Sequence, residues 1–462
     1  MNCFALQTLV IPTSVTEIGL STDKSEYIGA IFEGCMALKD LTIPFVGQRA
    51  IGLYDNDLTV YTGLGWLFGT KAPGYDDYSK RYFMTHYLAE NTSSKVAEIK
   101  QYFAESYNAT IEELYNNYLA AYIYNYNKTF FTEITESDVS DTIKTTIRQE
   151  AYDDAFENAL FDLADSKMQG YYNDVYSSYL DVNFKIVNQR NKAYSNTSNT
   201  KREGNTQAFY VTNSLLYVSL TNTSVIPWDA FAECSSIKEL DVRESSNLCY
   251  IGDYAFYMCE SLEAFAQDTD LSDYGLNFVS KKNEIVTMSA MGDQVDTVNP
   301  TDVKYIGDYA FYMNTKLYWF YMPKKVETIG AWSFYKTSAL RRIVIPQTAG
   351  AANTKGRTGE SAFESSGVEE ISLENDYISN HMFKDCDNLT SIVIPMLRYT
   401  GVGAFQDCDS LISIKSKNDT YSDYMFESCD DLIYAFVPTW VHNVGNYVFA
   451  NCTSLISVII DN

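Results

Sequence analysis

One short motif recurs along the chain and limits the possible folds more than any other feature. Its form is A-F-x-x-C-x-x-L, and a β-rich run that ends in proline follows it. Copies occur at Ala404 to Leu411, Met425 to Leu432 and Val448 to Leu455, and Leu340 to Pro346 is one of the runs. The phenylalanines of neighbouring copies lie 20 to 29 residues apart between positions 311 and 449. This period is typical of a leucine-rich-repeat solenoid.

Eight of the nine cysteines occupy the same position of the motif. They are Cys3, Cys35, Cys234, Cys259, Cys386, Cys408, Cys429 and Cys452. In three further copies the cysteine is replaced by Asn314, Thr337 and Ser366. Because the thiols share one repeat position, we expect a structural column of reduced, buried cysteines that act as small hydrophobic residues. Parallel side-chain directions oppose disulfides, and the spacing is not that of a metal site.

Each copy is predicted to form one coil, whose apolar face is buried only against the next coil. In L-x-x-I-x-I-P the first, fourth and sixth positions are expected to point inward, and the others outward onto a concave parallel sheet. The proline ends the strand because it has no backbone donor. A second segment, V-x-x-I-G-x-x-A-F, turns the chain back at Val326 to Phe334, and we interpret its glycine as a tight-turn residue.

These motifs resemble the BspA-like, or Treponema-type, leucine-rich repeats of bacterial surface proteins. The resemblance covers residues 1–75 and 209–462, which we interpret as N-terminal and C-terminal repeats. It implies an α+β chain built as a leucine-rich-repeat solenoid with short parallel strands and about eleven repeat copies. It also implies a cell-surface or extracellular location and adhesion to a protein of a host or a neighbouring cell.

Residues 76–208 carry no repeat and are predicted to form a helical, tyrosine-rich insertion of about three helices. The expected helices are Ser94 to Phe131, Ile143 to Leu163 and Tyr171 to Lys192, because apolar residues recur there every three or four positions. The second helix is expected to start after a cap at Ser137 or Asp138 and to break near Gly170. A smaller insertion is predicted near residues 268–300.

Composition argues against several classes of function. The 462 residues include 60 acidic and 34 basic side chains, so the net charge is −26 and a nucleic-acid partner is not expected. No apolar run reaches the roughly 18 residues of a membrane span, so no membrane insertion is expected, and Met1 to Pro12 lacks the pattern of a secretory signal. Catalytic and phosphate-binding motifs are absent, and the three histidines lie far apart. We therefore expect no enzyme activity, no cofactor and no metal.

The candidate binding residues occupy outward positions of the predicted strands. They are Tyr318, Trp319, Tyr321, Arg341 and Arg342, followed by Glu369 and Glu370, and a second cluster of Ile433, Tyr434 and Phe436 four coils further on. Aromatic residues combined with arginine are typical of binding hot spots. The alternative is that these rings pack beneath the helical insertion or reflect a tyrosine-rich chain.

Two functions remain open from the sequence. The first is a non-enzymatic cell-surface or secreted binding module, whose concave face meets a protein or glycan ligand. The second is a structural spacer or a scaffold that polymerises head to tail. The sequence begins within a repeat and stops after a strand, without a polar cap. This predicts either a piece of a longer protein or self-association through end residues Leu455, Val458 and Ile460.

Overall fold

The structure is a computed structural model of the whole chain. It describes residues 3, 5–19, 30–52, 60–70, 94–130, 132–161, 166–194, 201–266, 278–279, 285–286, 303–318, 320–351 and 357–460. The chain divides into two compact units. One unit holds Met1–Thr70 and Phe184–Asn462, and the other holds Lys71–Asn183.

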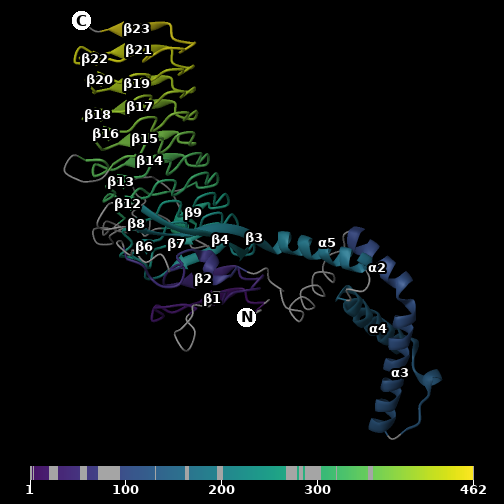
Figure 1. Cartoon of the computed structure of the whole chain (residues 1–462). Helices are drawn as coiled ribbons and strands as arrows, with labels where there is room; N and C mark the ends of the chain where they lie inside the picture. Colours follow the sequence, from purple (N-terminus) through teal and green to yellow (C-terminus); the bar gives the residue numbers. More distant parts are fainter. Residues whose placement is uncertain are drawn as a thin grey trace. The chain divides into compact units, whose positions relative to one another are not determined.

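The first unit is a stack of coils, most of which contribute a short parallel strand (Figure 1). The coil of Tyr318 and Tyr321, where the sequence predicted a strand, has none among its described residues. We call these strands together the long-strand sheet. Its first part has the order β1 (Thr8–Val10), β2 (Asp40–Ile43), β5 (Tyr217–Leu220), β7 (Glu239–Asp241) and β9 (Ala264–Ala266). Parallel pairs follow: β14 (Arg342–Ile345) with β15 (Glu370–Leu373), β17 (Ser391–Ile394) with β19 (Ser413–Ser416), and β21 (Tyr434–Val437) with β23 (Ser457–Ile460). The predicted leucine-rich-repeat solenoid is confirmed.

A second row of two-residue parallel strands lies in the V-x-x-I-G segments of the coils. These strands are β6 (Val225–Ile226), β8 (Tyr250–Ile251), β12 (Tyr305–Ile306), β13 (Thr328–Ile329), β16 (Tyr377–Ile378), β18 (Tyr399–Thr400), β20 (Thr420–Tyr421) and β22 (Asn443–Val444). One antiparallel pair, β10 (Phe278–Val279) with β11 (Ile285–Val286), lies in the small insertion predicted near 268–300. The rest of that insertion lies outside the described residues.

The inward and outward positions of the long strands follow the sequence pattern. Leu340, Ile343 and Ile345 are fully buried, whereas the arginines between them are partly exposed. The A-F-x-x-C units bury a column of phenylalanines that runs from Phe231 to Phe449. Neighbouring rings in this column stack 4.9 to 5.8 Å apart, with planes within 13° of parallel. The core therefore continues from coil to coil.

The motif cysteines lie beside this phenylalanine column as free thiols. Six of them, Cys35, Cys234, Cys259, Cys386, Cys408 and Cys429, are buried, while Cys452 is partly buried and Cys3 is exposed. The thiols of Cys259, Cys386, Cys408, Cys429 and Cys452 each donate to the phenylalanine carbonyl of the preceding coil at 3.0 to 3.3 Å. Burial raises the pKa of Cys386 to about 12, so this thiol stays protonated at neutral pH.

The glycine of V-x-x-I-G has a different role from the tight turn that we expected. Gly330 and Gly359 do not have positive φ. A Cβ atom on Gly330 would lie 2.3 Å from the carbonyl carbon and oxygen of Gly307 in the preceding coil. On Gly359 it would lie 2.1 Å from the backbone nitrogen of Ala331. Glycine is therefore needed because neighbouring coils approach closely at this position.

Left-handed backbone recurs in the turns around the A-F-x-x-C unit, which we call the turn row. The residue before the alanine and the residue before the cysteine have φ between 51° and 62° in the coils from Asp229 to Asn451. Only Gly403 is a glycine among them. For other residue types this conformation costs roughly 1–2 kcal/mol, which the packing of the coils must offset.

The helical insertion enters the solenoid between the phenylalanine and the cysteine position of one coil. The 3₁₀ helix η1 (Leu64–Leu67) leads to Phe68, which is buried in the core next to Phe32. The chain returns through β4 (Lys201–Thr212), and Thr212 then occupies the position of the motif cysteine, three residues before Leu215. Its hydroxyl donates to the Met36 carbonyl in the preceding coil at 3.2 Å. The stack is thus continuous across the insertion.

A two-stranded antiparallel ribbon joins the insertion to this coil, and it replaces part of an expected helix. Its strands are β3 (Phe184–Tyr194) and β4. The predicted helix Tyr171 to Lys192 ends at Asn183, because the following residues bind the solenoid instead. Gln189 is buried there, accepts from the Gly65 N–H at 2.9 Å and donates to the carbonyls of Ala230 and Ala232.

The second unit is helical in the part that the structure describes. Its helices are α2 (Ser94–Ser106), α3 (Asn108–Phe130), α4 (Asp141–Phe161) and α5 (Ser166–Asn183), with a 3₁₀ turn η2 (Glu136–Asp138). The single predicted helix Ser94 to Phe131 is thus two helices that meet at Tyr107, and α5 continues through Gly170, where we expected a break. Ser140, rather than Ser137 or Asp138, caps α4, because its hydroxyl accepts from the Ile143 N–H at 3.4 Å. The unit ends at residue 183, whereas the sequence placed this boundary at 208.

Candidate binding face of the long-strand sheet

The outward side chains of the long strands form the candidate site, which we call the sheet face. Parallel pairing places equivalent positions of successive coils side by side. Arg342 pairs with Glu370, Val393 with Lys415, and Phe436 with Ile459. A repeat position therefore becomes a row of side chains along the stack.

The central part of the sheet face is charged and internally neutralised. The Arg341 guanidinium lies 3.4 Å from the Glu369 carboxylate, and that of Arg342 lies 3.0 Å from Glu370. Arg341 also donates to the Gly367 carbonyl at 3.1 Å. The structure thus brings the predicted arginines and glutamates together, but as ion pairs between coils. Exposed pairs of this kind contribute about 1 kcal/mol or less to stability.

The predicted aromatic residues beside these arginines are placed as follows. Tyr318 is exposed, and its N–H donates to the Glu263 carbonyl of the preceding coil at 3.1 Å. Tyr321 is half-buried. Trp319 lies outside the described residues. The first predicted cluster therefore has one exposed ring among the residues that the structure describes.

The last coils carry a large exposed apolar surface around the second predicted cluster. We call it the C-terminal apolar patch, and it comprises Ile412, Ile433, Tyr434, Phe436, Ile456 and Ile459. Tyr434 is 59% exposed and Phe436 is 46% exposed. The Ile456 N–H donates to the Ile433 carbonyl at 3.0 Å, so these isoleucines are neighbours across two coils. A contiguous apolar surface on a folded domain is typical of an interaction site.

The last coil also exposes apolar residues at positions that are buried in the preceding coil. Val458 is 42% exposed, whereas Ala435 at the same position of the preceding coil is 2% exposed. Ile460 is 68% exposed, whereas Val437 beside it is 7% exposed. Leu455 is partly buried against the core. The three predicted end residues thus differ in exposure. Within the described residues, β23 pairs only with β21, so its other edge is not covered by a further strand.

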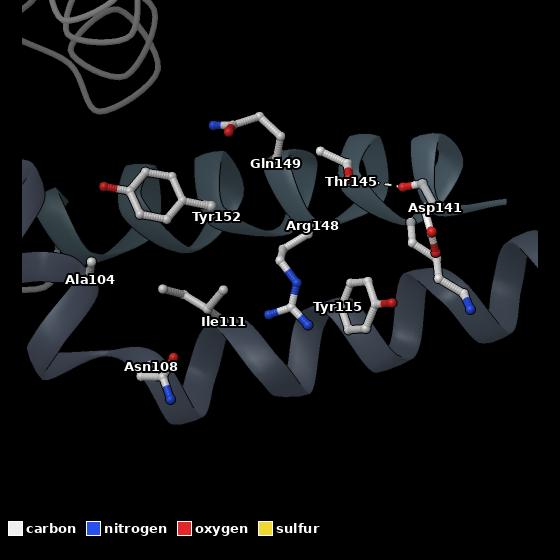
Figure 2. Close-up of a pocket in the computed structure, with 10 residues that line it drawn as sticks. Ala104, Asn108, Ile111, Tyr115, Asp141, Thr145, Arg148, Gln149 and Tyr152 are labelled. Atoms are coloured by element: carbon white, nitrogen blue, oxygen red, sulfur yellow. Dashed lines mark hydrogen bonds between the residues drawn. The ribbon is translucent and has the colours of Figure 1, made fainter. Parts of the chain in front are cut away.

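The helical unit holds a groove of about 640 Å³ between α3 and α4 (Figure 2). Arg148 reaches from α4 to α3, where it binds Glu112 and lies 4.2 Å over the ring of Tyr115. The bond to Glu112 raises the pKa of the Arg148 guanidinium. Lys144 and Asp141 add one charge of each sign to the lining. The Arg148 guanidinium therefore links α3 and α4 and is neutralised by Glu112. Lys144 and Asp141 balance each other, so the groove has no net charge with which to select a ligand.

A column of acidic residues follows the motif cysteines in the last coils. Asp387 and Asp409 lie in adjacent coils, and the pKa of each carboxyl is raised, first by burial and then by neighbouring carboxylates. A raised folded-state pKa means that the folded protein binds these protons more tightly than the unfolded chain. Their contribution to stability is therefore fully present in acid and is lost as the pH rises through the raised pKa.

We expect Asp409→Asn to raise the melting temperature at pH 7, because it removes an unfavourable charge. The gain over the wild type should shrink toward zero near pH 4, around the ordinary pKa of aspartate. Thermal melts of both proteins across this range would measure the difference. Asp431→Asn, at an exposed position of the next coil, is the control and should show a smaller gain at pH 7. Equal gains in melting temperature for both variants would contradict the conclusion that the Asp409 carboxylate is destabilised by burial and by neighbouring carboxylates.

Sequence reasoning missed two sets of exposed residues. Ile412, Ile456 and Ile459 extend the second cluster, and their signal is an apolar residue at an outward position of L-x-x-I-x-I. A second set consists of half-buried aromatic residues on the turn row of the coils that contain Tyr254, Tyr309 and Trp332. Its signal is the run Ile-Gly-Asp-Tyr-Ala-Phe-Tyr-Met, which occurs at 251–258 and again at 306–313.

No candidate metal site stands out in the part of the chain that the structure describes. No group of three or more His, Cys, Asp or Glu side chains among these residues is arranged to hold a metal ion. His381 lies 3.7 Å from Glu360, and His442 lies in a different coil. The described helices include none that is long and apolar enough to cross a membrane.

Family models identify the repeats directly. The model of the BspA type leucine rich repeat region matches in six copies, over residues 202–296, 294–355 and 356–462, which is more than half of the chain. The chain therefore belongs to the BspA-type leucine-rich repeat family, as the repeated motif predicted. Among curated proteins no match was found.

Several solved bacterial structures are similar to this chain at low identity. A leucine-rich repeat protein from Bacteroides ovatus is 19% identical, with a TM-score of 0.36, over 60% of this chain and 71% of that one. A leucine rich cell surface protein from Faecalibacterium prausnitzii is 17% identical, with a TM-score of 0.28, over 55% and 80%. The Treponema pallidum leucine rich repeat protein is 17% identical, with a TM-score of 0.29, over 52% and 78%.

Proposed function

We propose that this protein is a non-enzymatic binding and adhesion module of the cell surface or extracellular space, and that the sheet face meets the partner. Membership of the BspA-type leucine-rich repeat family supports a repeat module that binds other proteins. One similar structure is described as a cell surface protein, which supports the location. The repeats supply a stiff platform because each coil packs only on its neighbours.

The C-terminal apolar patch is the observation that carries this proposal. Its residues come from coils held by the buried phenylalanine column, so the patch is preorganised. Tyr434 and Phe436 supply large rings with few rotatable bonds, which lose little entropy on binding. Aliphatic neighbours such as Ile412 and Ile456 favour a protein partner over a glycan, because they offer apolar area without hydrogen-bonding groups.

An adhesion assay tests this function. Beads coated with the full chain would be added to cultured epithelial cells and to bacterial cells, since the partner is expected on a host or neighbouring cell. We expect a Tyr434→Ser, Phe436→Ser variant to lose most of the bead attachment, because central aromatic residues dominate binding energy. Protease treatment of the cells should abolish attachment if the partner is a protein, and glycosidase treatment should do so if it is a glycan.

The matched control is Tyr447→Ser. Tyr447 is 62% exposed, close to Tyr434, but it belongs to the turn row rather than to the sheet face. The Tyr447→Ser variant should therefore leave bead attachment unchanged. Equal loss in both variants, or no loss in the sheet-face variant with an unchanged melting temperature, would argue against the sheet face as the adhesive surface.

The second candidate function is a spacer or scaffold that assembles head to tail. In such an assembly another copy would cover Val458 and Ile460, as the next coil covers the same positions elsewhere in the stack. Light scattering coupled to size-exclusion chromatography over a hundredfold concentration range tests it. Assembly would give a mass that rises from about 52 kDa and returns to it in Val458→Lys, Ile460→Lys. A constant mass at all concentrations would rule out this assembly.

A further inference from the structure

Three neighbouring coils carry a strip of aromatic side chains on the turn row, away from the positions of the sheet face. We call it the turn-row strip, and it consists of Tyr254, Tyr257, Tyr309, Tyr312, Trp332 and Tyr335. Its rings form two stacked rows. In one row Tyr309 lies 4.8 Å from Tyr254 and 5.3 Å from Trp332, and in the other Tyr312 lies 5.1 Å from Tyr257 and 4.9 Å from Tyr335. All six side chains are half-buried.

The solenoid itself does not require aromatic residues at these positions. Other coils place Asp229, Ser361, His381 and Gly403 where this strip has Tyr254, Tyr309 and Trp332, whereas the last two coils have Tyr424 and Tyr447 there. The three aromatic residues have φ of 56°, 58° and 51°, in the left-handed region that disfavours bulky side chains. The same left-handed backbone recurs in the coils from Asp229 to Asn451, so the strip is distinguished by the size of its side chains and not by its backbone. Stacking stabilises the rows, but it leaves open why partly exposed rings are kept at unfavourable backbone positions.

The spacing of the rings fits an extended chain with a threefold repeat. Successive rings are about 5 Å apart, so Tyr254 and Trp332 are separated by about 10 Å over two coil steps. A polyproline II helix returns to the same face every three residues, at a rise of about 3.1 Å per residue, which is about 9 Å per turn. Prolines three residues apart would therefore contact rings two coils apart. Recognition of such helices by aromatic surfaces is a general mode of peptide binding.

One carboxylate beside the strip offers a contact for a basic ligand. The Glu364 carboxylate is near enough to Tyr312 to help raise the pKa of that phenol, after the larger effects of burial and of the neighbouring tyrosines. The Asp308 carboxylate next to Tyr309 already accepts from the Arg357 guanidinium at 2.8 Å. Cations of the chain itself already lie over rings at the two ends: Arg190 is 5.6 Å from the Tyr254 ring, and Lys336 is 5.3 Å from the Tyr335 ring. Aromatic rings near carboxylates attract lysine and arginine by both charge and cation–π interaction.

We propose that the turn-row strip binds an extended, proline-rich segment of a partner protein that carries lysine or arginine. The prolines contact the ring edges of successive coils, and the basic side chains reach the carboxylate of Glu364. This surface is separate from the sheet face, so the proposal does not depend on what the sheet face binds.

Titration of the full chain with synthetic peptides tests the proposal. The probes are a fluorescent peptide that repeats proline-proline-arginine, the same peptide with alanine for proline, and the same peptide with glutamate for arginine. Fluorescence anisotropy should show binding of the first peptide and at least about tenfold weaker binding of the other two. Equal affinity of the alanine peptide would overturn the polyproline assignment, and no binding of the first peptide would overturn the proposal.

Variants place the site on the strip. Trp332→Ser introduces the residue that the next coil has at this position, Ser361, and should weaken binding at least about tenfold, as expected of a hot-spot aromatic residue. Tyr335→Ser removes a ring of the second row without adding a charge and serves if the first variant fails to fold. Tyr434→Ser, on the sheet face, should leave peptide affinity unchanged. Unchanged affinity in a folded Trp332→Ser or Tyr335→Ser protein would overturn the assignment.

Glycans are the main competing occupants of an aromatic strip. Oligosaccharides of chitin and of cellulose would be titrated against the same variants. If they bind, displace the peptide and lose affinity in Trp332→Ser, the strip is a glycan site and the proposal is wrong. If they do not displace the peptide, the proposal stands.

Discussion

Phe334→Ala is expected to lower the free energy of unfolding of the solenoid by about 3–5 kcal/mol, the usual range for removing a buried phenylalanine. The Phe334 ring is fully buried between Phe311, at 5.1 Å, and Phe363, at 4.9 Å. Its loss leaves a cavity in the middle of the column, where the coils above and below are fixed by their own hydrogen bonds. Because coils are stable only against their neighbours, the weakness should spread to adjacent coils.

Tryptophan fluorescence during denaturation would measure this effect on the solenoid alone. The five tryptophans are at 66, 228, 319, 332 and 440, so none lies in the helical unit of residues 71–183. Phe436→Ala is the matched control, because the same side chain is removed from the exposed sheet face, where a change within about 0.5 kcal/mol is expected. A similar small change in Phe334→Ala would show that the phenylalanine column does not carry the stability of the stack.

Gly330→Ala is expected to cost about 3 kcal/mol or more, although only a methyl group is added. The new Cβ would lie 2.3 Å from backbone atoms of Gly307. Backbone cannot move aside as a flexible side chain does, so the two coils must separate and their strand pairing at β12 and β13 must weaken. The fluorescence transition of the solenoid should therefore shift to a much lower denaturant concentration.

Gly170→Ala is the same substitution as Gly330→Ala, but it is expected to stabilise the protein. Gly170 lies inside α5, and nothing lies within 4 Å of the position that its Cβ would take. Alanine should stabilise that helix by about 0.5–1 kcal/mol. Far-ultraviolet circular dichroism would follow the helical unit, while fluorescence should stay unchanged. Destabilisation of the helices by this variant would contradict the open environment of Gly170.

The repeat period and the inward positions could be predicted because they depend on local periodicity. Leu340, Ile343 and Ile345 recur in a pattern that only one side of a strand can satisfy. The cysteine position was equally clear from its replacement by Asn314, Thr337 and Ser366. The role of glycine in V-x-x-I-G was misread, because the close approach of two coils is not visible in one coil's sequence.

The candidate site was less predictable than the fold. The sequence placed Arg341 and Arg342 in a binding cluster, but their ion pairs with Glu369 and Glu370 depend on the register between coils. The apolar patch around Tyr434 was found in part, because its isoleucines look like ordinary strand residues. A shift of one residue along the strand moves such a side chain from the core to the exposed face.

The helical insertion shows the same limit. Its helices follow from apolar spacing, yet β3 replaced the end of the third expected helix because Gln189 and its neighbours bind backbone groups of the solenoid. Thr212 likewise takes the cysteine position only after the chain returns from the insertion. Propensity is a weak local preference that tertiary contacts override.

The amino-acid sequence by itself determined the solenoid, its family and the faces of its strands, because these depend on a pattern that each coil repeats within about twenty residues. Only the tertiary structure decided which outward residues are neutralised, which remain as an exposed patch and which rings form the turn-row strip. The physical reason is that these properties arise between coils. Charge pairing, ring stacking and close backbone approach require the register of residues that are more than twenty positions apart in the sequence.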